Sequence, residues 1–257
     1  MHKKLIIFDL DGTLTESKSD MDAEMSRLLC ALLAKKPVAV IGGGKYELFQ
    51  GQLLKKLRCP GSRLRRLYLF PTTSTAFYRY GTRGWRRVYV HALTKGQRRR
   101  ISRAFQKVLR ELEYVPPVKL YGNVIEDRGT QVTFSALGQD IVRVLGEKGV
   151  RLKKEWKRKN TALKMKIARR VQRELPDLEV RAAGYTSIDV TQKGIDKAYG
   201  IRQIRTHLNV PVRDMLFVGD ALEPGGNDYA ARRTGVRCVP VSGPRATKKL
   251  IRSLLRD

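Results

Sequence analysis

Two aspartates, Asp9 and Asp11, follow directly after the apolar residues 5–8, and Gly12 comes next. The apolar run is typical of a short buried strand, and the glycine marks a turn at its end. Open α/β sheets bind their ligands at the carboxyl ends of strands. Because neighbouring carboxylates repel each other unless a cation lies between them, the pattern predicts a Mg²⁺ site at which one Asp can attack an electrophile.

The same Asp-x-Asp-Gly pattern also occurs in ordinary acidic turns and at the start of calcium-binding loops. A calcium loop needs further oxygen ligands, a closing Glu and a helix before it. Thr15, Ser17 and Asp20 do not supply that pattern. The metal-site interpretation is favoured over an acidic turn because matching residues occur far downstream.

Three distant residues complete the predicted site. Asp220 follows the apolar residues 215–218, Asp228 follows the glycine-rich turn after it, and Lys197 lies near the start of a predicted helix. Each Asp follows a strand or a tight turn, so these side chains are expected to converge at one edge of the sheet. Clustered carboxylates require a metal, and a nearby Lys balances the charge of an incoming phosphate.

The elements that must position these residues alternate in the first and last thirds of the chain. Strands are predicted at residues 5–8, 38–41, 67–70, 215–218 and 236–240, and helices at 22–34, 46–57, 195–208, 228–234 and 245–255. This order predicts a parallel sheet with helices on both faces. The middle differs: strands at 76–80, 86–91, 118–126, 131–134 and 178–182 and helices at 95–113, 140–147 and 161–175 predict an α+β insert with an antiparallel sheet.

The chain is strongly basic, with 53 Lys and Arg against 24 acidic residues and a formal net charge of +29. Such a charge concentrates anions, including phosphorylated substrates and nucleic acids. Trp85 lies in a basic cluster at residues 83–87 and Trp156 in another at 153–159. Aromatic residues among basic ones are compatible with weak, non-specific binding of nucleic acid. No nucleic-acid-binding motif accompanies the charge, so a solvated basic surface is the favoured interpretation.

Length and composition set the broad class. A chain of 257 residues with 42% hydrophobic content is expected to form a soluble globular protein of one or two domains. No apolar stretch approaches the length of a membrane span, and the start is too short for a signal peptide. The three cysteines, Cys30, Cys59 and Cys238, show neither metal-binding spacing nor a disulfide framework, so a cytoplasmic protein is expected.

These motifs resemble those of the haloacid dehalogenase superfamily of phosphoryl-transfer enzymes. Residues 9–15 look like its first motif, Lys197 matches the third, and Asp220 with Asp228 matches the fourth. The chain is most similar to the eukaryotic-type phosphomannomutases, in the branch that carries a type IIB α/β cap between the second and third motifs. Similar segments span nearly the whole chain, at residues 40–43, 125–129, 187–190, 194–197 and 224–228.

The resemblance implies a Rossmann-like core with a parallel sheet and an inserted α+β cap. We expect the core at residues 1–78 and 187–257, and the cap at 79–186. By the same resemblance, Asp9 is the nucleophile that becomes an aspartyl-phosphate, and Asp11 is the general acid and base. Lys197 assists catalysis, and Mg²⁺ is held by Asp9, Asp11, Asp220 and Asp228. A homodimer formed through the cap is also implied.

The expected substrate-binding residues depart from the family in several places. The second motif of the family has a Ser or Thr that binds the transferring phosphoryl group, and here Gly43 and Gly44 form a glycine turn whose N–H groups can hold an anion. The family grips a sugar phosphate with arginines. Arg128 matches one of them, Lys18 falls where another is expected, and Gln139 replaces a third. Ser187 and Asp189 match the sugar-contacting pair, and the family's Glu-Asn-Gly is replaced at residues 72–74.

Three functions are compatible with this sequence. The favoured one is a Mg²⁺-dependent phosphatase of a small phosphorylated metabolite, such as a sugar phosphate, because Gln139 lacks the charged fork of Arg. The alternative is a phosphomannomutase, which interconverts mannose 6-phosphate and mannose 1-phosphate. A third, from a different class, is a basic nucleic-acid-binding protein or a terminal-phosphate phosphatase, which salt-dependent binding would distinguish.

Overall fold

The structure of this chain is a computed structural model that describes residues 3–117 and 119–256. It divides into two units, one formed by Met1–Val90 with Asp196–Asp257 and the other by His91–Ile195. Each unit has its own sheet and its own hydrophobic core.

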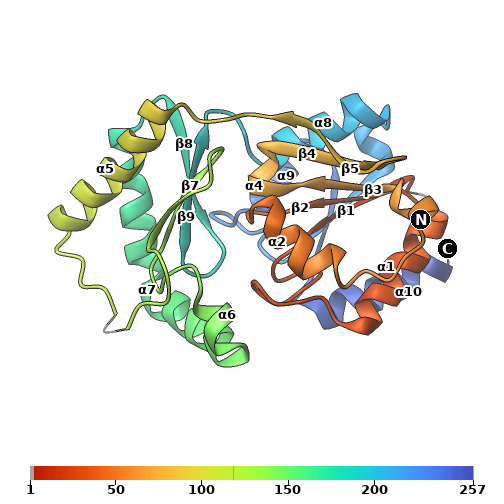
Figure 1. The fold of residues 1–257 in the computed structure, drawn as a ribbon, viewed down its shortest axis with the longest axis horizontal. Helices are drawn as coiled ribbons and strands as arrows, with labels where there is room; N and C mark the ends of the chain where they lie inside the picture. The colour runs from red at the N-terminus through yellow and green to blue at the C-terminus, as the bar shows by residue number, and fades with distance from the viewer. Residues whose placement is uncertain (1–2, 118, 257) are drawn as a thin grey trace. The chain divides into compact units, whose positions relative to one another are not determined.

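A seven-stranded sheet forms the centre of the first unit (Figure 1). Its strands lie in the order β11-β10-β1-β2-β3-β4-β5. Five strands are parallel, and the last two form an antiparallel hairpin at one edge. The parallel strands are β1 (Leu5–Asp9), β2 (Val38–Ile41), β3 (Leu67–Phe70), β10 (Met215–Gly219) and β11 (Arg237–Pro240), and the hairpin strands are β4 (Ala76–Gly81) and β5 (Gly84–Val90).

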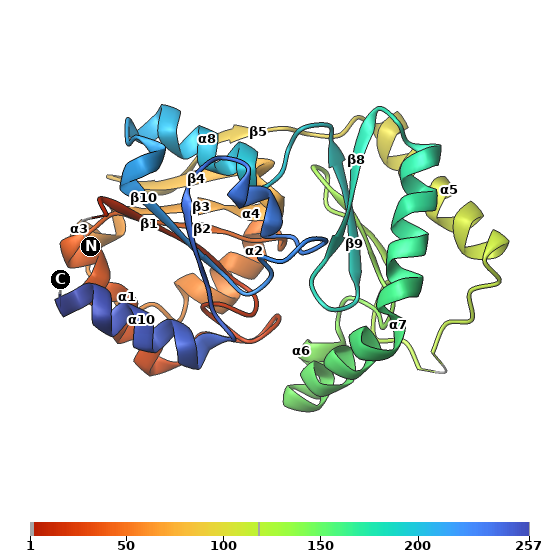
Figure 2. The same cartoon turned by 180° about the vertical axis from the view of Figure 1, so that it is seen from behind.

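Successive residues of the central strands enter two different cores. Ile6 and Phe8 of β1 belong to the core on one face of the sheet, whereas Leu5 and Ile7 belong to the core on the other. This division explains why these strands are continuous apolar runs rather than alternating patterns. Figure 2 shows the sheet from behind, with the helices of both faces around it.

Helices close both faces of this sheet. One face is covered by α1, the α2–η1 pair and α10, whereas α8 covers the other (Figures 1 and 2). Among the described residues, no helix is both long enough and apolar enough to cross a membrane. The elements are α1 (Ala23–Lys35), α2 (Tyr46–Phe49), η1 (Gln50–Leu54), α3 (Gly61–Leu64), α4 (Pro71–Ser74), α8 (Lys197–Leu208), η2 (Val212–Asp214), α9 (Tyr229–Arg232) and α10 (Pro244–Arg256).

The second unit is an antiparallel sheet with helices packed on its apolar face. Its strands lie in the order β6-β7-β9-β8, and Phe134 and Val190 point into the core that α5 and α7 cover. A non-helical residue, Asn160, interrupts α7. The elements are α5 (Lys95–Glu111), β6 (Ile125–Asp127), β7 (Val132–Ser135), α6 (Ile141–Leu145), α7 (Glu147–Glu174), β8 (Leu178–Ala183) and β9 (Ser187–Gln192).

The boundaries of the second unit differ from the expected insert at 79–186. The β4–β5 hairpin extends the core sheet by pairing with β3, and β9 completes the sheet of the second unit. A hairpin pattern does not reveal which sheet the hairpin joins, and this displaced the first boundary. The second boundary moved because β9 pairs with β7. Of the strand expected at 118–126, the structure contains only Ile125–Asp127, and Val118 lies outside the described residues.

The cysteines correct a second expectation. Cys30 of α1 and Cys59, which follows η1, form a disulfide with their Cα atoms 5.5 Å apart, whereas Cys238 is free. The two partners are 29 residues apart, and the sequence spacing contains no signal for their pairing. They meet because α1 and the segment after η1 lie side by side against the same core.

Candidate active site

A buried cluster of opposite charges lies at the carboxyl ends of β1 and β10. The Lys197 ammonium donates a hydrogen bond to Asp9 Oδ1 at 2.5 Å and another to Asp228 Oδ1. The side chains of all three residues are at most 3% exposed. Because unpaired buried charges are strongly unfavourable, the arrangement is stable only while these partners are kept together.

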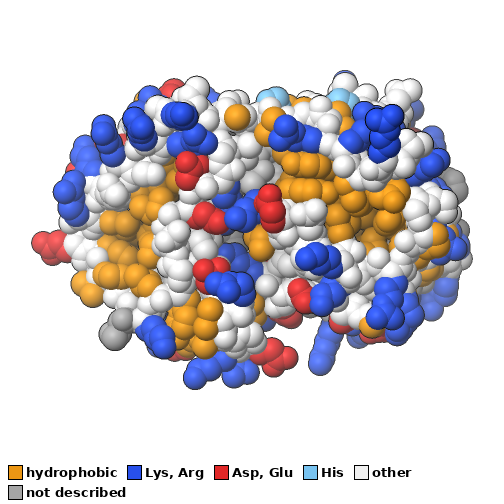
Figure 3. Space-filling model, in the orientation of Figure 1, with side chains coloured by type: hydrophobic (Ala, Val, Ile, Leu, Met, Phe, Trp, Pro, Cys, Tyr) orange, Lys and Arg blue, Asp and Glu red, His pale blue; other side chains and the backbone are white. Residues whose placement is uncertain are grey.

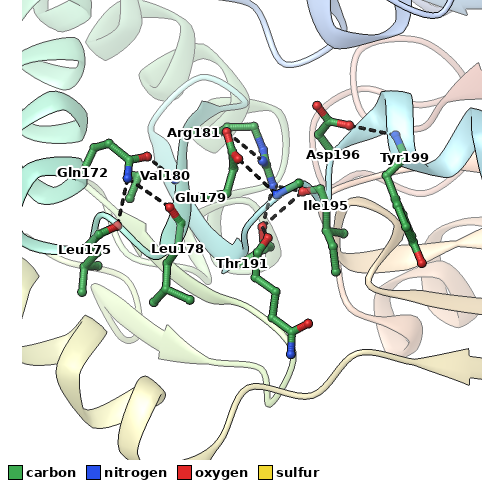
Figure 4. Close-up of polar contacts among 12 residues, drawn as sticks. Gln172, Leu175, Leu178, Glu179, Val180, Arg181, Thr191, Ile195, Asp196 and Tyr199 are labelled. Carbon is green, nitrogen blue, oxygen red and sulfur yellow. Dashed lines mark hydrogen bonds and ion pairs between the residues drawn. The ribbon is translucent and has the colours of Figure 1, made fainter.

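The position of Lys197 is set by the start of α8. The Asp196 carboxylate accepts the backbone N–H of Tyr199 at 2.8 Å and so caps the helix, as Figure 4 shows. Lys197 is therefore the first residue of α8, and its side chain extends from a fixed helix terminus. The charges of Asp228 and Asp9 raise the pKa of Lys197 above its usual value although burial opposes them, so the ammonium stays protonated.

Two glycines leave the space that the aspartates occupy. A Cβ atom on Gly12, whose φ is +89°, would collide with the carboxylate of Asp220. A Cβ atom on Gly219 would collide with the carboxylate of Asp228, which also accepts the N–H of Ala221 at 3.0 Å. Gly12 and Gly219 are therefore required because a carboxylate packs closely against each of them. Gly12 is also required for its positive φ.

Three of the predicted metal ligands do lie together. Asp9, Asp220 and Asp228 each offer a carboxylate oxygen, and these oxygens are all within 4.8 Å of one another. Asp9 Oδ2 is buried and has no hydrogen-bond partner among the described residues. Burial, followed by the charges of Asp228 and Asp220, raises the pKa of Asp9 well above its usual value, against the effect of Lys197. Hard oxygen donors with a surplus of negative charge fit a divalent ion such as Mg²⁺.

Asp11 lies in the same loop, but its carboxylate has a different partner. It accepts the backbone N–H of Lys18 at 2.5 Å, and it is not part of the three-carboxylate cluster. Lys18 itself has a left-handed backbone with φ of +53°. The loop from Asp11 to Lys18 is therefore closed by a side-chain contact that holds the Asp11 carboxylate in place.

The glycine turn after β2 packs against residues 72–74, where the resemblance implies a departure from the family. The N–H of Thr72 donates to the carbonyl of Gly44 at 2.8 Å, and residues 72–74 all have positive φ. A Cβ atom on Gly44 would lie 3.1 Å from Leu48 Cδ1, which is tight for any side chain.

Ser74 Oγ is buried without a hydrogen-bond partner among the described residues. Three consecutive left-handed residues are strained, and such strain concentrates at functional sites. Gly43 lies beside Gly44 in the glycine turn after β2.

In the second unit, Arg128 and Gln139 contact each other directly. Arg128 Nε donates to Glu126 Oε2 at 2.7 Å, and Arg128 Nη2 donates to Gln139 Oε1 at 3.0 Å. The Arg128 side chain is only 4% exposed. Gln139, which the resemblance places where the family has an arginine, therefore acts as a hydrogen-bond acceptor for Arg128.

Asp189 lies on the polar face of the second sheet. Thr133 Oγ1 donates to Asp189 Oδ1 at 2.8 Å and accepts the side-chain amide of Gln131 at 2.8 Å. Ser187, at the start of β9, is partly buried. Burial and the charge of Lys157 lower the pKa of Lys164 to about 8, and the negative charge of Asp189 opposes this shift.

Sequence reasoning missed two of these partners. Glu126 orients Arg128, and Thr133 orients Asp189. Both carried a usable signal: Glu126 lies two residues before Arg128 in the same short strand-and-turn segment, and Thr133 alternates with the apolar residues Val132 and Phe134. Alternation places Thr133 on the polar face of β7, where its neighbour on β9 is Asp189.

Comparison with known structures identifies the class of this fold. An IMP-nucleotidase from Plasmodium falciparum, in its IMP-bound form, aligns with a TM-score of 0.72 at 16% identity, covering 99% of this chain and 68% of that one. The sucrose-phosphatase of Synechocystis sp. PCC6803 aligns with a TM-score of 0.51 at 14% identity, covering 94% and 83%. The fold and the motifs at Asp9, Lys197 and Asp220 define a phosphoryl-transfer enzyme of the haloacid dehalogenase superfamily.

Sequence comparison identifies the family. Residues 25–257 match the family described as eukaryotic phosphomannomutase, and the chain belongs to that family. A phosphomannomutase of Encephalitozoon cuniculi is 28% identical over 257 residues, covering 99% of this chain and 94% of the relative. A probable phosphomannomutase of Caenorhabditis elegans is 26% identical, covering 99% and 96%.

We expect Asp220→Ala to weaken the dependence on Mg²⁺, because it removes one of three convergent carboxylates. The measurement is the stabilisation of the protein in thermal unfolding as Mg²⁺ is titrated, together with the metal dependence of turnover. Glu223→Ala is the matched control, since it removes an exposed carboxylate from the same loop. Equal Mg²⁺ titrations of the wild type and Asp220→Ala would contradict the assignment.

Proposed function

We propose that this protein is a hexose-phosphate mutase of the phosphomannomutase type that works through a phosphoryl group on Asp9. The observation that carries the proposal is the buried contact of Lys197 with Asp9 and Asp228, beside the third carboxylate of Asp220. Its relatives are named phosphomannomutases, which favours isomerisation over the hydrolysis that the sequence alone suggested.

In the first step, Asp9 attacks a phosphorus atom of a hexose bisphosphate, and a hexose monophosphate leaves. A carboxylate oxygen forms a bond to phosphorus, the bond from phosphorus to the ester oxygen breaks, and the leaving oxygen takes a proton. Lys197 fixes Oδ1 of Asp9, so the proposal assigns the attack to Oδ2, the oxygen without a hydrogen-bond partner among the described residues. In the second step, the free hydroxyl of a hexose monophosphate attacks the phosphoryl group, and the bond from phosphorus to Asp9 breaks. The product is a hexose bisphosphate, which reorients so that Asp9 can take its other phosphoryl group and release the isomerised monophosphate.

Asp11 is the proposed acid and base for both steps. It protonates the leaving oxygen in the first step and accepts the proton of the attacking hydroxyl in the second. Its contact with the Lys18 backbone holds the carboxylate in one position. The proposed roles of nucleophile and of acid and base thus fall on aspartates with different partners. Asp9 accepts a hydrogen bond from the Lys197 ammonium, and Asp11 accepts one from the Lys18 backbone N–H.

Charge neutralisation makes up most of the catalysis of phosphoryl transfer. Lys197 keeps Asp9 and Asp228 close together in spite of their mutual repulsion and contributes positive charge beside the reacting group. Asp9, Asp220 and Asp228 would hold Mg²⁺, with Asp11 contributing through its backbone. When bound, this ion would neutralise charge on the phosphoryl oxygens. The turn at Gly43 and Gly44 is the proposed anion-binding loop for these oxygens.

The second unit supplies the proposed contacts to the rest of the substrate. Arg128 is the candidate ligand for a phosphate, because Glu126 and Gln139 already hold its guanidinium in place. Asp189 and Ser187 are the candidate ligands for sugar hydroxyls, and Lys18 of the first unit is a candidate phosphate ligand.

Hydrolysis is the second candidate function, and one observation favours it. Gln139 accepts a hydrogen bond from Arg128 and brings no positive charge, at a position where the resemblance implies an arginine in the family. A mutase must retain a bisphosphate intermediate while the intermediate changes orientation. Weaker retention would allow water to intercept the phosphoryl group on Asp9.

The deciding experiment follows mannose 1-phosphate by ³¹P NMR with Mg²⁺, with and without a hexose bisphosphate to prime the enzyme. We expect mannose 6-phosphate to form faster than inorganic phosphate. Release of inorganic phosphate without isomerisation, under both conditions, would replace the mutase by the phosphatase.

We expect Asp9→Asn to abolish turnover while the fold is retained. Loss of a covalent nucleophile costs several orders of magnitude in rate. The control is Asp20→Asn, which changes an exposed aspartate outside the cluster. Activity of Asp9→Asn above about a tenth of the wild type would show that another group is the nucleophile.

We expect Arg128→Met to lower kcat/KM for mannose 1-phosphate by about ten- to a hundred-fold, because a charge-assisted hydrogen bond contributes about 1.5–3 kcal/mol. The ratio of isomerisation to phosphate release should fall as well, since the intermediate is held less firmly. Arg143→Met, an exposed arginine of the same unit, is the matched control. An unchanged ratio with an unchanged kcat/KM would remove Arg128 from the substrate site.

A further inference from the structure

A basic hollow lies on the outer side of α5, within the second unit. Its volume is about 490 Å³, and it is lined by four cations of α5, by Ser102 and Gln106 of the same helix, and by Asp127 at the end of β6. Figure 3 shows Lys and Arg side chains gathered over this helix. The four cations are Lys95, Arg98, Arg99 and Arg103.

The hollow lies on a different side of the second unit from Asp189, a residue proposed to bind sugar hydroxyls. The opposite face of α5 carries Ile101, Phe105 and Val108, which are buried in the core of the second unit. Ring stacking of Phe105 on Phe134 fixes that face against β7. The hollow therefore belongs to the helix side of this unit, whereas Thr133 and Asp189 lie on the polar face of its sheet.

The cations of α5 fall into two groups by their partners. Arg100 is paired with Asp177, and Lys107 is paired with Glu174 at 2.9 Å, so these two charges are neutralised within the chain. In the hollow, Arg98 lies 3.3 Å from Asp127. The other three, Lys95, Arg99 and Arg103, are exposed and contact no carboxylate among the described residues.

The spacing of these three residues suits a chain of phosphates. They recur every four residues, so they lie on one face of the helix about 6 Å apart along its axis. Like charges at this spacing repel each other, and a bound polyanion removes the repulsion. Arginine forks bind phosphate oxygens in pairs, and the exposed side-chain amide of Gln106 offers a further hydrogen-bond donor.

We propose that this hollow binds a small molecule that carries two or three linked phosphate groups. Lys95, Arg99 and Arg103 hold successive phosphates, while Arg98 stays paired with Asp127 in the lining. The limited volume and the negative charge of Asp127 favour a small ligand over a nucleic-acid backbone, which would extend beyond the hollow. The proposal does not depend on the mutase assignment, because none of its residues belongs to the reacting cluster.

The test is calorimetric titration of the whole protein with tripolyphosphate, in a buffer of physiological ionic strength without divalent cations. The variant is the double substitution Arg99→Gln and Arg103→Gln. The matched control is Arg100→Gln with Lys107→Gln, which removes two positive charges from the same helix outside the hollow. Equal melting temperatures of the two double variants confirm that α5 is intact in both.

We expect the hollow variant to bind tripolyphosphate at least about tenfold more weakly than the wild type, and the control to change by less than about threefold. Equal losses in both variants would show that binding follows the overall charge and would overturn the proposal. Absence of binding to the wild type would overturn it too. A single-stranded oligonucleotide that loses more affinity than tripolyphosphate in the hollow variant would make nucleic acid the occupant, which also contradicts it.

Discussion

The site depends on one unfavourable arrangement, which is two carboxylates buried together with a single ammonium group. Asp9 and Asp228 would repel each other in a buried environment, and Lys197 offsets that repulsion by contacting both. Two carboxylates and one ammonium leave one negative charge, and the third carboxylate of Asp220 adds another. The cluster is thus suited to accept a divalent cation. Burial, and after it the charges of Asp228 and Asp220, raise the pKa of Asp9, so both its surroundings and its neighbours favour a bound cation.

The surrounding fold holds these charged residues close together. The parallel order of β1 and β10 brings their carboxyl ends to one edge of the sheet, which places Asp9 near Asp220 and Asp228. The helix α8 must begin at Lys197, and its cap at Asp196 ensures that it does. Gly12 and Gly219 are also needed, because a side chain at either position would displace a carboxylate.

Much of this was predictable from the sequence because the signals are local. An apolar run followed by an acidic residue is visible at Asp9 and Asp220, and parallel topology then brings them together. The contact of Arg128 with Gln139 was harder to predict, because it forms only after β6 and β7 have paired. The sheet that receives the β4–β5 hairpin and the pairing of Cys30 with Cys59 depend on tertiary packing, and no local pattern encodes either.

The central claim is that the phosphoryl group passes through Asp9, and covalent trapping tests it most directly. The enzyme is mixed with a ³²P-labelled hexose bisphosphate and Mg²⁺, quenched in acid within milliseconds, and digested for peptide mapping. We predict a label on the peptide that contains Asp9, which hydroxylamine removes as expected of an acyl phosphate and which an unlabelled hexose monophosphate discharges before the quench. A label on another residue, or turnover without any labelled protein, would contradict the account.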